Sequence, residues 1–250
     1  MQIKRWMQGL GVVYTLLLLT ICVPGWRMIR NGDEVQSTIK RIDGKQTVGQ
    51  REKEEQETET RGKEKPKIAL TFDDGPSAVY TPVLLDGLEK RGVKATFFLI
   101  GKNIETGGNA EIVKREQDEG HLIGNHTYNH VEITKLDDES AYQELKRTNE
   151  VIEGITGETV EFMRPPFGAW QKALEKKIHV LPVMWTVDPL DWATENPDEI
   201  VNKVVTEVEE NDIILLHDCY DSSVKAALRI VDLLQAEGFE FVTVDELLVN

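Results

Sequence analysis

The chain has 250 residues, and 40% of them are hydrophobic, which is too many for a disordered chain and enough for a sizeable core. The formal net charge is −15, which excludes functions that need a basic surface, and we expect no nucleic-acid partner. Residues 66–250 hold 17 bases and 35 acids, so the acidity belongs to the part predicted to fold. The two cysteines, Cys22 and Cys219, lie in unrelated parts of the chain, and we expect no disulfide between them.

Residues 1–30 are predicted to be a membrane segment. Lys4 and Arg5 precede a stretch from Trp6 to Trp26 that has no charged residue, and a bilayer is crossed by about 20 apolar residues. No small-x-small cleavage signal follows Val23, which favours a retained N-terminal helix over a cleaved signal peptide. We therefore expect an extracytoplasmic protein anchored to the cell membrane, or a secreted one if the helix is cleaved.

Residues 31–65 are predicted to be a flexible charged linker. Lys, Glu, Gln, Thr and Gly dominate from Lys40 onwards, and residues 51–65 contain no aliphatic or aromatic side chain. Such a segment cannot bury enough apolar surface to fold, so we expect an extended tether.

Residues 66–250 alternate short apolar runs with amphipathic stretches. The runs predicted as strands are 68–72, 95–99, 122–124, 160–163, 180–185, 213–216 and 239–242. The stretches predicted as helices are 79–90, 110–119, 137–155, 170–176, 197–209, 222–235 and 244–248. This alternation indicates an α/β fold with a parallel sheet covered by helices, and seven units favour a barrel short of the eightfold form. An open doubly wound sheet is the alternative.

Polar, titratable residues gather directly after five of the predicted strands. In a parallel barrel the carboxyl ends of the strands share one face, and active sites form there. The sequence therefore predicts one site built from these five segments: 71–76, 125–130, 164–168, 188–192 and 217–218.

The residue types in these segments suit metal-assisted hydrolysis. His126 and His130 are four apart, so both can face one side of a helical turn and share a metal with a carboxylate. A second carboxylate can act as general base, and His217 can protonate a leaving amine. Taken singly, the segments have plainer interpretations, such as a turn at Asp73-Asp74-Gly-Pro or a buried structural His217. His121 and His179 fall outside the segments and are expected to be ordinary strand-edge residues.

These segments, taken together, resemble the polysaccharide deacetylases with a NodB-homology domain, carbohydrate esterase family 4. The motifs Thr-Phe-Asp-Asp-Gly-Pro, His-Thr-Tyr-Asn-His, Arg-Pro-Pro-Phe-Gly, Asp-Pro-Leu-Asp-Trp and Leu-Leu-His-Asp follow one another in the family's order. The resemblance covers residues 66–250 and implies a distorted (β/α)7 barrel. It also implies a metal-dependent hydrolase that removes N-acetyl groups from sugars.

The resemblance assigns the metal ligands. It implies that Asp74, His126 and His130 hold a divalent metal ion, with Thr127 supporting the loop between the histidines. An Asp-His-His set suits zinc best, and cobalt, nickel and manganese remain alternatives.

The resemblance also assigns the groups that move protons. It implies that Asp73 is the general base and His217 the general acid. Arg164 would orient Asp73, and Asp191 would tune His217. All four positions match the family's motifs.

Four further residues are predicted to contact the substrate. The resemblance implies that the Phe167 N–H helps hold the oxyanion, that Trp192 forms part of the pocket wall, and that Leu215 lines the pocket for the acetyl methyl. Pro166, in the same loop as Phe167, is the fourth.

The substrate is less constrained than the chemistry. A tether next to the membrane favours N-acetylglucosamine-type residues of bacterial peptidoglycan, although the motifs do not separate these from N-acetylmuramic acid. The alternatives are a chitooligosaccharide or exopolysaccharide deacetylase, an O-acetyl xylan esterase, a hydrolase of small cyclic amides and a non-catalytic wall-binding protein. Beyond the acetylated polysaccharide and the membrane, we expect no obligate protein partner.

Overall fold

The computed structural model of this protein describes residues 65–248. The membrane segment predicted at residues 1–30, and all of the predicted linker except Lys65, lie outside the described residues. A search of residues 65–248 finds no helix that is both long and apolar enough to span a bilayer.

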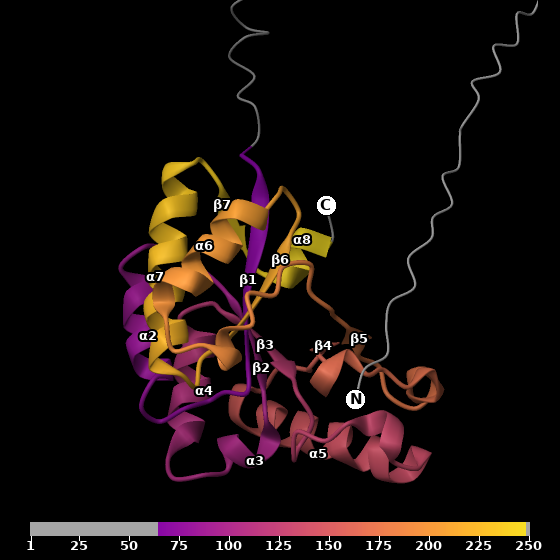
Figure 1. The fold of residues 1–250 in the computed structure, drawn as a ribbon. Helices are drawn as coiled ribbons and strands as arrows, with labels where there is room; N and C mark the ends of the chain where they lie inside the picture. Colours follow the sequence, from indigo (N-terminus) through magenta and orange to yellow (C-terminus); the bar gives the residue numbers. More distant parts are fainter. Residues whose placement is uncertain (1–64, 249–250) are drawn as a thin grey trace, which may run out of the picture. The chain divides into compact units, whose positions relative to one another are not determined.

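The described residues contain a seven-stranded sheet in which every strand pair is parallel (Figure 1). Its order is β5-β4-β3-β2-β1-β6, and β7 pairs with the first half of β1. Each of the predicted strands is present, although β4 and β5 are each only two residues long. The strands are β1 (Lys67–Asp73), β2 (Thr96–Leu99), β3 (Leu122–Asn125), β4 (Phe162–Met163), β5 (Leu181–Pro182), β6 (Ile213–His217) and β7 (Glu240–Val242).

The chain that follows β5 closes the sheet into a ring. The Val183 N–H donates to the Met163 carbonyl at 2.8 Å, so this segment starts alongside β4. It then reaches β6, where the Thr186 N–H donates to Ile213 O and the Leu215 N–H to Val187 O, both at 2.9 Å. The segment after β5 is joined to β6 by these few hydrogen bonds and not by a full strand pair, so the ring is distorted at this point. This closure confirms the predicted distorted (β/α)7 barrel and not the alternative, an open doubly wound sheet.

The alternation of side chains along β1 explains why the catalytic candidates point inwards. Ile68, Leu70 and Phe72 belong to the large apolar cluster between the sheet and the helices, whereas Ala69 belongs to a second cluster. Successive side chains of a strand point to opposite faces, so Thr71 and Asp73 share the face of Ala69. That second cluster fills the barrel interior. Besides Ala69 it takes one residue from each of four other strands, Val183 after β5, and two residues of the last helix: Phe98, Phe162, Ile213 and Val242, with Val183, Val244 and Leu247.

Helices surround the sheet, and Figure 1 shows α2, α6 and α7 gathered on one side of β1. The helix predicted at residues 170–176 is instead a 3-10 helix, η3 (Lys172–Lys176), because only Leu174 in it is buried and no apolar stripe supports an α-helix. The short α3 (Gly101–Ile104) was not predicted. The other helices are α2 (Thr81–Glu89), α4 (Asn109–Asp118), α5 (Asp138–Thr156), α6 (Pro197–Glu207), α7 (Asp221–Ala236) and α8 (Val244–Leu248), with 3-10 turns η1 (Ile133–Lys135), η2 (Pro166–Gly168) and η4 (Asp191–Ala193).

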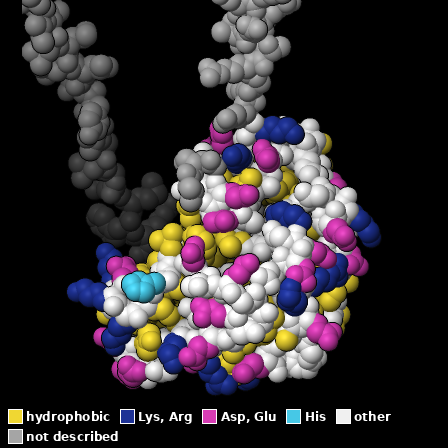
Figure 2. All heavy atoms as spheres, turned by 180° about the vertical axis from the view of Figure 1, so that it is seen from behind, with side chains coloured by type: hydrophobic (Ala, Val, Ile, Leu, Met, Phe, Trp, Pro, Cys, Tyr) yellow, Lys and Arg dark blue, Asp and Glu magenta, His cyan; other side chains and the backbone are white. Residues whose placement is uncertain are grey.

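The charges of the described residues are spread out over the face seen in Figure 2. Acidic and basic side chains are interspersed there, with apolar areas between them. The excess of acid in residues 66–250 is therefore not gathered into one acidic patch on this face.

Candidate active site and metal centre

The loops at the carboxyl ends of the strands enclose a cavity of about 400 Å³. Parallel strands deliver their last residues to the same rim, so segments more than 140 positions apart in the sequence meet here. The cavity is lined by Asp73, Asp74, His126, His130, Pro165, Phe167, Trp185, Asp188, Trp192, Leu215, His217 and Tyr220.

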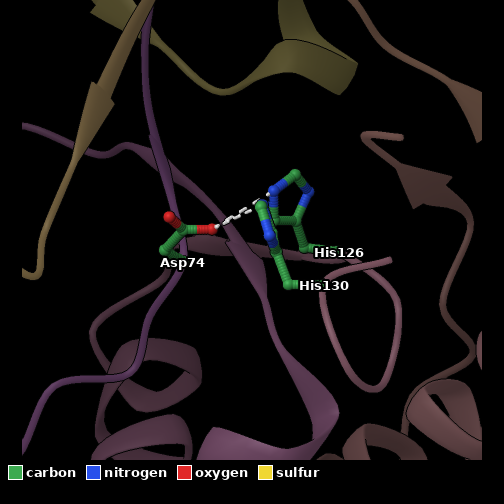
Figure 3. Close-up of side chains that lie close together, drawn as sticks. All are labelled: Asp74, His126 and His130. Atoms are coloured by element: carbon green, nitrogen blue, oxygen red, sulfur yellow. Dashed lines mark ion pairs between the residues drawn. The ribbon is translucent and has the colours of Figure 1, made fainter. Parts of the chain in front are cut away.

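Asp74, His126 and His130 form the one metal-compatible cluster found among residues 65–248 (Figure 3). Asp74 Oδ1 lies 3.4 Å from His126 Nε2 and 3.2 Å from His130 Nε2. Metal–ligand bonds of about 2.0–2.1 Å in a tetrahedron place neighbouring ligand atoms about 3.3 Å apart. Asp74 Oδ1 is also buried and has no hydrogen-bond partner in the described structure, a costly state that a bound cation would relieve. The three residues therefore fit a divalent metal.

The two histidines are not on a helical turn, so that part of the sequence reasoning is wrong. Residues 126–130 form an irregular loop after β3. Thr127 (φ 63°) and His130 (φ 54°) both adopt left-handed backbone conformations, which fold the loop back so that both imidazoles face Asp74. Thr127 is buried, and its Oγ1 accepts the Val131 N–H at 3.3 Å, as expected of a loop support.

His126 is oriented by the segment that carries Arg164. Its Nδ1 lies 2.7 Å from the Arg164 carbonyl oxygen, which can only accept, so Nδ1 carries the proton. The Nε2 lone pair is then left to face Asp74. A second hydrogen bond of this kind fixes the tautomer and direction of metal-binding histidines.

The pKa shifts at the cluster favour the protonation states that a metal needs. Burial raises the pKa of Asp74, but the interaction with His126, together with the charges of His130 and His217, outweighs it and lowers the pKa below its usual value. Burial lowers the pKa of His130. A carboxylate and neutral imidazoles are the ligand forms of these side chains.

Asp73 is held by Arg164 inside the barrel. Arg164 Nη1 donates to Asp73 Oδ1 at 2.8 Å and to Thr71 Oγ1 at 2.7 Å, and both charged residues are buried. The remaining hydrogen bonds of the Arg164 guanidinium are to the carbonyls of Val183 and Met184, at 3.2 and 3.3 Å. Asp73 Oδ2 is left on the side of the metal cluster, 3.7 Å from His126 Nε2.

His217 is held twice by Asp191. Asp191 Oδ1 lies 2.8 Å from His217 Nδ1, and Asp191 Oδ2 accepts the His217 backbone N–H, also at 2.8 Å. Burial by itself lowers the pKa of His217, but the hydrogen bond and charge of Asp191, with the charges of Asp73 and Asp74, raise it to about 9. His217 Nε2, the other ring nitrogen, lies 4.0 Å from Asp74 Oδ2.

Backbone strain is concentrated around this cavity. Among residues 65–248, six non-glycine residues have positive φ, and five of them lie in the loops that build the site. Such conformations cost about 1–3 kcal/mol each and persist where the surrounding structure enforces them. The five are Asp74, Thr127, His130, Phe167 and Leu190.

Three of the four predicted substrate contacts line the cavity, namely Phe167, Trp192 and Leu215. Phe167 is 68% exposed and Trp192 58%, so each presents a large apolar surface to solvent at the rim. Pro166 is buried and does not line the cavity, whereas its neighbour Pro165 does.

Besides Pro165, three lining residues were not singled out from the sequence: Trp185, Asp188 and Tyr220. Each had a positional signal that could have found it. Trp185 ends the fifth predicted strand, Asp188 opens a motif already recognised, and Tyr220 follows His217 by three positions.

The two remaining histidines lie away from the site. His179 is exposed, and His121 is buried at the start of β3, where its Nδ1 accepts the Ala95 N–H at 3.0 Å. Cys219 is a free thiol.

Comparison with known proteins gives consistent results. The family model for polysaccharide deacetylase matches residues 60–184. A peptidoglycan-N-acetylglucosamine deacetylase of Listeria monocytogenes is 37% identical over 187 residues, which cover 75% of this chain but only 40% of that protein. The structure of a Bacillus subtilis peptidoglycan deacetylase superposes with a TM-score of 0.71 at 35% identity, covering 74% of this chain and 90% of that one. A family 4 acetyl xylan esterase from Clostridium thermocellum, solved with cobalt, gives a TM-score of 0.68 at 33% identity, covering 73% and 90%.

Proposed function

This chain belongs to the polysaccharide deacetylase family, and we propose from this that it hydrolyses the N-acetyl groups of N-acetylglucosamine residues in peptidoglycan. The observation that carries the proposal is the convergence of three units in one cavity: the Asp74-His126-His130 cluster, the Asp73–Arg164 pair and the Asp191–His217 pair. Together they supply the base, the acid and the metal ligands that amide hydrolysis needs.

Asp74, His126 and His130 would hold the metal. When bound, a divalent metal in such a site polarises an acyl oxygen and lowers the pKa of water. Zinc is the metal we propose because one carboxylate and two imidazoles suit it best.

Asp73 is the proposed general base. Its Oδ1 is fixed by Arg164, which leaves Oδ2 to accept a proton from the attacking water. Four hydrogen bonds hold the guanidinium of Arg164 in place, and this stops the Asp73 carboxylate from turning.

His217 is the proposed general acid. Asp191 holds its Nδ1, so the proton available for transfer is the one on Nε2, next to Asp74. Donation of that proton to the departing nitrogen releases the amine of a glucosamine unit, while the acetyl group leaves as acetate. The Phe167 N–H is proposed as a donor to the oxygen that becomes negative during the reaction.

The polymer is the finer part of the proposal. Peptidoglycan is supported by the names of the Listeria and Bacillus relatives, although this chain spans about 40% of the length of the first of them. Exposed Phe167 and Trp192 offer apolar surfaces against which the sugars of a chain can lie.

An O-acetyl esterase is the second candidate. The acetyl xylan esterase of Clostridium thermocellum shares the fold at 33% identity, and ester and amide cleavage use the same groups. A non-catalytic wall-binding protein is disfavoured because the candidate base, acid and ligands all have the residue types that turnover requires.

We further propose that residues 1–30 anchor the protein to the cell membrane on its outer side. The uncharged stretch from Trp6 to Trp26 supports this. Pro66 enters the domain at the amino end of β1, and Asp73 lies at the carboxyl end of the same strand. A tether attached there joins the domain at the end opposite the catalytic cavity.

One parallel assay tests the function. Acetate release should be measured with the zinc-loaded full-length protein on intact peptidoglycan, N-acetylated chitooligosaccharides and acetylxylan. We expect the highest kcat/KM on peptidoglycan. Higher kcat/KM on acetylxylan would assign an esterase instead, and no acetate from any of them would rule out a catalytic role.

A further inference from the structure

The loop at residues 126–130, here called the histidine loop, is held in shape by groups outside it. Each of the three backbone N–H groups between the two histidines donates to a side chain. The first two N–H groups of α3 donate to the carbonyls of Thr127 and Tyr128, both at 3.0 Å. The loop has no regular secondary structure of its own, so its conformation depends on these partners.

Glu144 of α5 supplies most of the acceptors for the histidine loop. Its Oε2 accepts the Tyr128 N–H at 3.0 Å and the Asn129 N–H at 2.8 Å. Its Oε1 accepts the side-chain Nδ2 of Asn129 at 2.7 Å. One carboxylate therefore binds three donors of the loop, and hydrogen bonds to a charged acceptor are among the stronger ones in proteins.

Asn125, the residue before His126, joins the loop to the same helix. Its Oδ1 accepts the Thr127 N–H at 2.7 Å. Its Nδ2 donates to the Leu145 carbonyl at 2.8 Å and to Asn149 Oδ1 at 2.6 Å. The helix α5 contributes no metal ligand, yet it determines where the backbone between the two histidines lies.

The side chain of Tyr128 is held between α3 and α5. The guanidinium of Arg147 lies 3.5 Å from the centroid of the Tyr128 ring. The Tyr128 hydroxyl donates to Glu105 Oε2, which also pairs with Arg147 Nη2 at 3.1 Å. Arg147 follows Glu144 by three positions, so both reach the loop from one side of the helix. Glu144 holds the backbone of the loop, and these contacts hold its central side chain.

The histidine loop needs this support because its backbone is strained. Thr127 (φ 63°) and His130 (φ 54°) are in left-handed conformations, which cost about 1–3 kcal/mol each. Without the acceptors of Glu144, the loop would relax to conformations in which the two imidazoles no longer converge on Asp74. A metal ion would then have to reorder the loop on binding, which would weaken its affinity.

We infer that Glu144 is a positioning residue that sets the metal affinity of the Asp74-His126-His130 cluster, because it holds the histidine loop in its metal-binding conformation. Glu144 does not itself line the catalytic cavity. The inference rests on the proposed function only in that the cluster binds a metal ion, and it does not depend on which substrate is cleaved.

The zinc affinity of the full-length protein tests this inference. Metal-free protein is titrated with zinc in competition with a chelating dye, so Kd is measured without turnover. Glu144→Ala should raise Kd about 10-fold to 100-fold, as expected when a group that orients metal ligands is removed. Glu144→Gln keeps one acceptor oxygen for the two backbone N–H groups. Its Kd should therefore lie between those of the unaltered protein and Glu144→Ala.

The matched control is Glu150→Ala, the same substitution on the same helix. Glu150 is exposed and pairs with Lys146 at 2.9 Å, so its removal should leave the zinc Kd unchanged. Thermal melting of the metal-free proteins shows whether each variant folds. A purely structural role for Glu144 would lower the melting temperature without changing the zinc Kd of the folded protein.

A zinc Kd for folded Glu144→Ala equal to that of Glu150→Ala would overturn the inference and leave the proposed function standing. If Glu144→Ala does not fold, an unchanged Kd in Glu144→Gln would overturn it in the same way. An unaltered protein that binds no zinc would instead remove the metal role of the cluster, and the inference with it. Acetate release tests the proposed function separately.

Discussion

Asp73 and His217 are register partners at the carboxyl ends of β1 and β6. Paired positions of neighbouring parallel strands point to the same face and lie about 4.8 Å apart, so strand pairing alone places the proposed base beside the proposed acid. Each then has its own support, Arg164 for Asp73 and Asp191 for His217. This division allows the two roles to be tested separately.

His217→Ala should affect substrates according to their leaving group. An amine must be protonated to depart, whereas an aryl oxide leaves without help, so the loss should be much larger for N-acetylglucosamine oligomers than for an aryl acetate. We expect kcat to fall about 100-fold to 10,000-fold on the oligomers. The measurement is kcat on both substrates. Equal losses on both would remove His217 from the role of acid, and His179→Ala, at an exposed histidine, is the control.

Arg164→Lys should lower kcat more than it changes KM. Lysine keeps the charge but cannot reproduce the fork that contacts Asp73, Thr71 and two carbonyls, so the base loses its orientation. We expect kcat to fall about 10-fold to 100-fold, and the free energy of unfolding to fall by about 1–3 kcal/mol because buried acceptors lose their donor.

The control for that change is Arg229→Lys. Arg229 pairs with Asp198 on the surface, where the same substitution should change the free energy of unfolding by less than about 1 kcal/mol. Steady-state kinetics and denaturant unfolding provide the two readouts. A variant with normal kcat would show that Asp73 does not need Arg164 for catalysis.

Removal of any proposed ligand should remove the metal and the activity together. Asp74→Ala, His126→Ala and His130→Ala should each lower zinc content to background and kcat/KM by at least about 100-fold, since a metal contributes several kcal/mol to such reactions. Metal analysis of the dialysed protein and acetate release are the measurements. Chelator-treated protein that is free of metal yet fully active would disprove the role of the cluster.

His121 should make folding stability depend on pH. Burial lowers the pKa of His121 from 6.5 to about 4, and the positive charges of Lys94 and Arg115 act in the same direction. The interaction with Glu119 opposes this shift. Between these values the unfolded chain binds a proton that the folded chain does not. The contribution of neutral His121 to the free energy of unfolding is therefore complete above pH 6.5. It is lost as the pH falls towards 4, and the total loss is about 3 kcal/mol.

Denaturant unfolding at several pH values between 4 and 7 checks this. His121→Asn should make the free energy of unfolding depend less on pH than in the unaltered protein. His179→Asn, at an exposed histidine, should leave this pH dependence unchanged. Parallel curves for the unaltered protein and His121→Asn would contradict the assigned cause.

Local patterns in the sequence were sufficient for the strands, for most of the helices and for the rim at which the candidate site lies. Apolar runs predicted each strand, and polar residues directly after them identified the rim, because both depend only on neighbours in the chain. The same reasoning failed where conformation is not local. The loop at His126–His130 was taken for a helical turn because a four-residue spacing does not reveal two left-handed residues.

The sequence also could not predict the positions of residues that belong to no motif. Trp185 and Tyr220 line the catalytic cavity because of where their loops fold. Asp245 and His121, about 120 positions apart, border a second cavity because α8 begins beside β2, where the Val244 N–H donates to Thr96 Oγ1. Nothing in the spacing of these residues predicts that they meet.

The sequence by itself determined the residue types available for chemistry, the seven strand–helix units and the face of β1 on which Asp73 lies, since a strand alternates with a period of two. Only the tertiary structure decided that Asp73 pairs with His217, that the chain after β5 closes the ring onto β6, and that Asp74 lies against both histidines. The physical reason is that register, closure and loop strain are set by hydrogen bonds and packing between segments far apart in the chain, whose energies no local pattern contains.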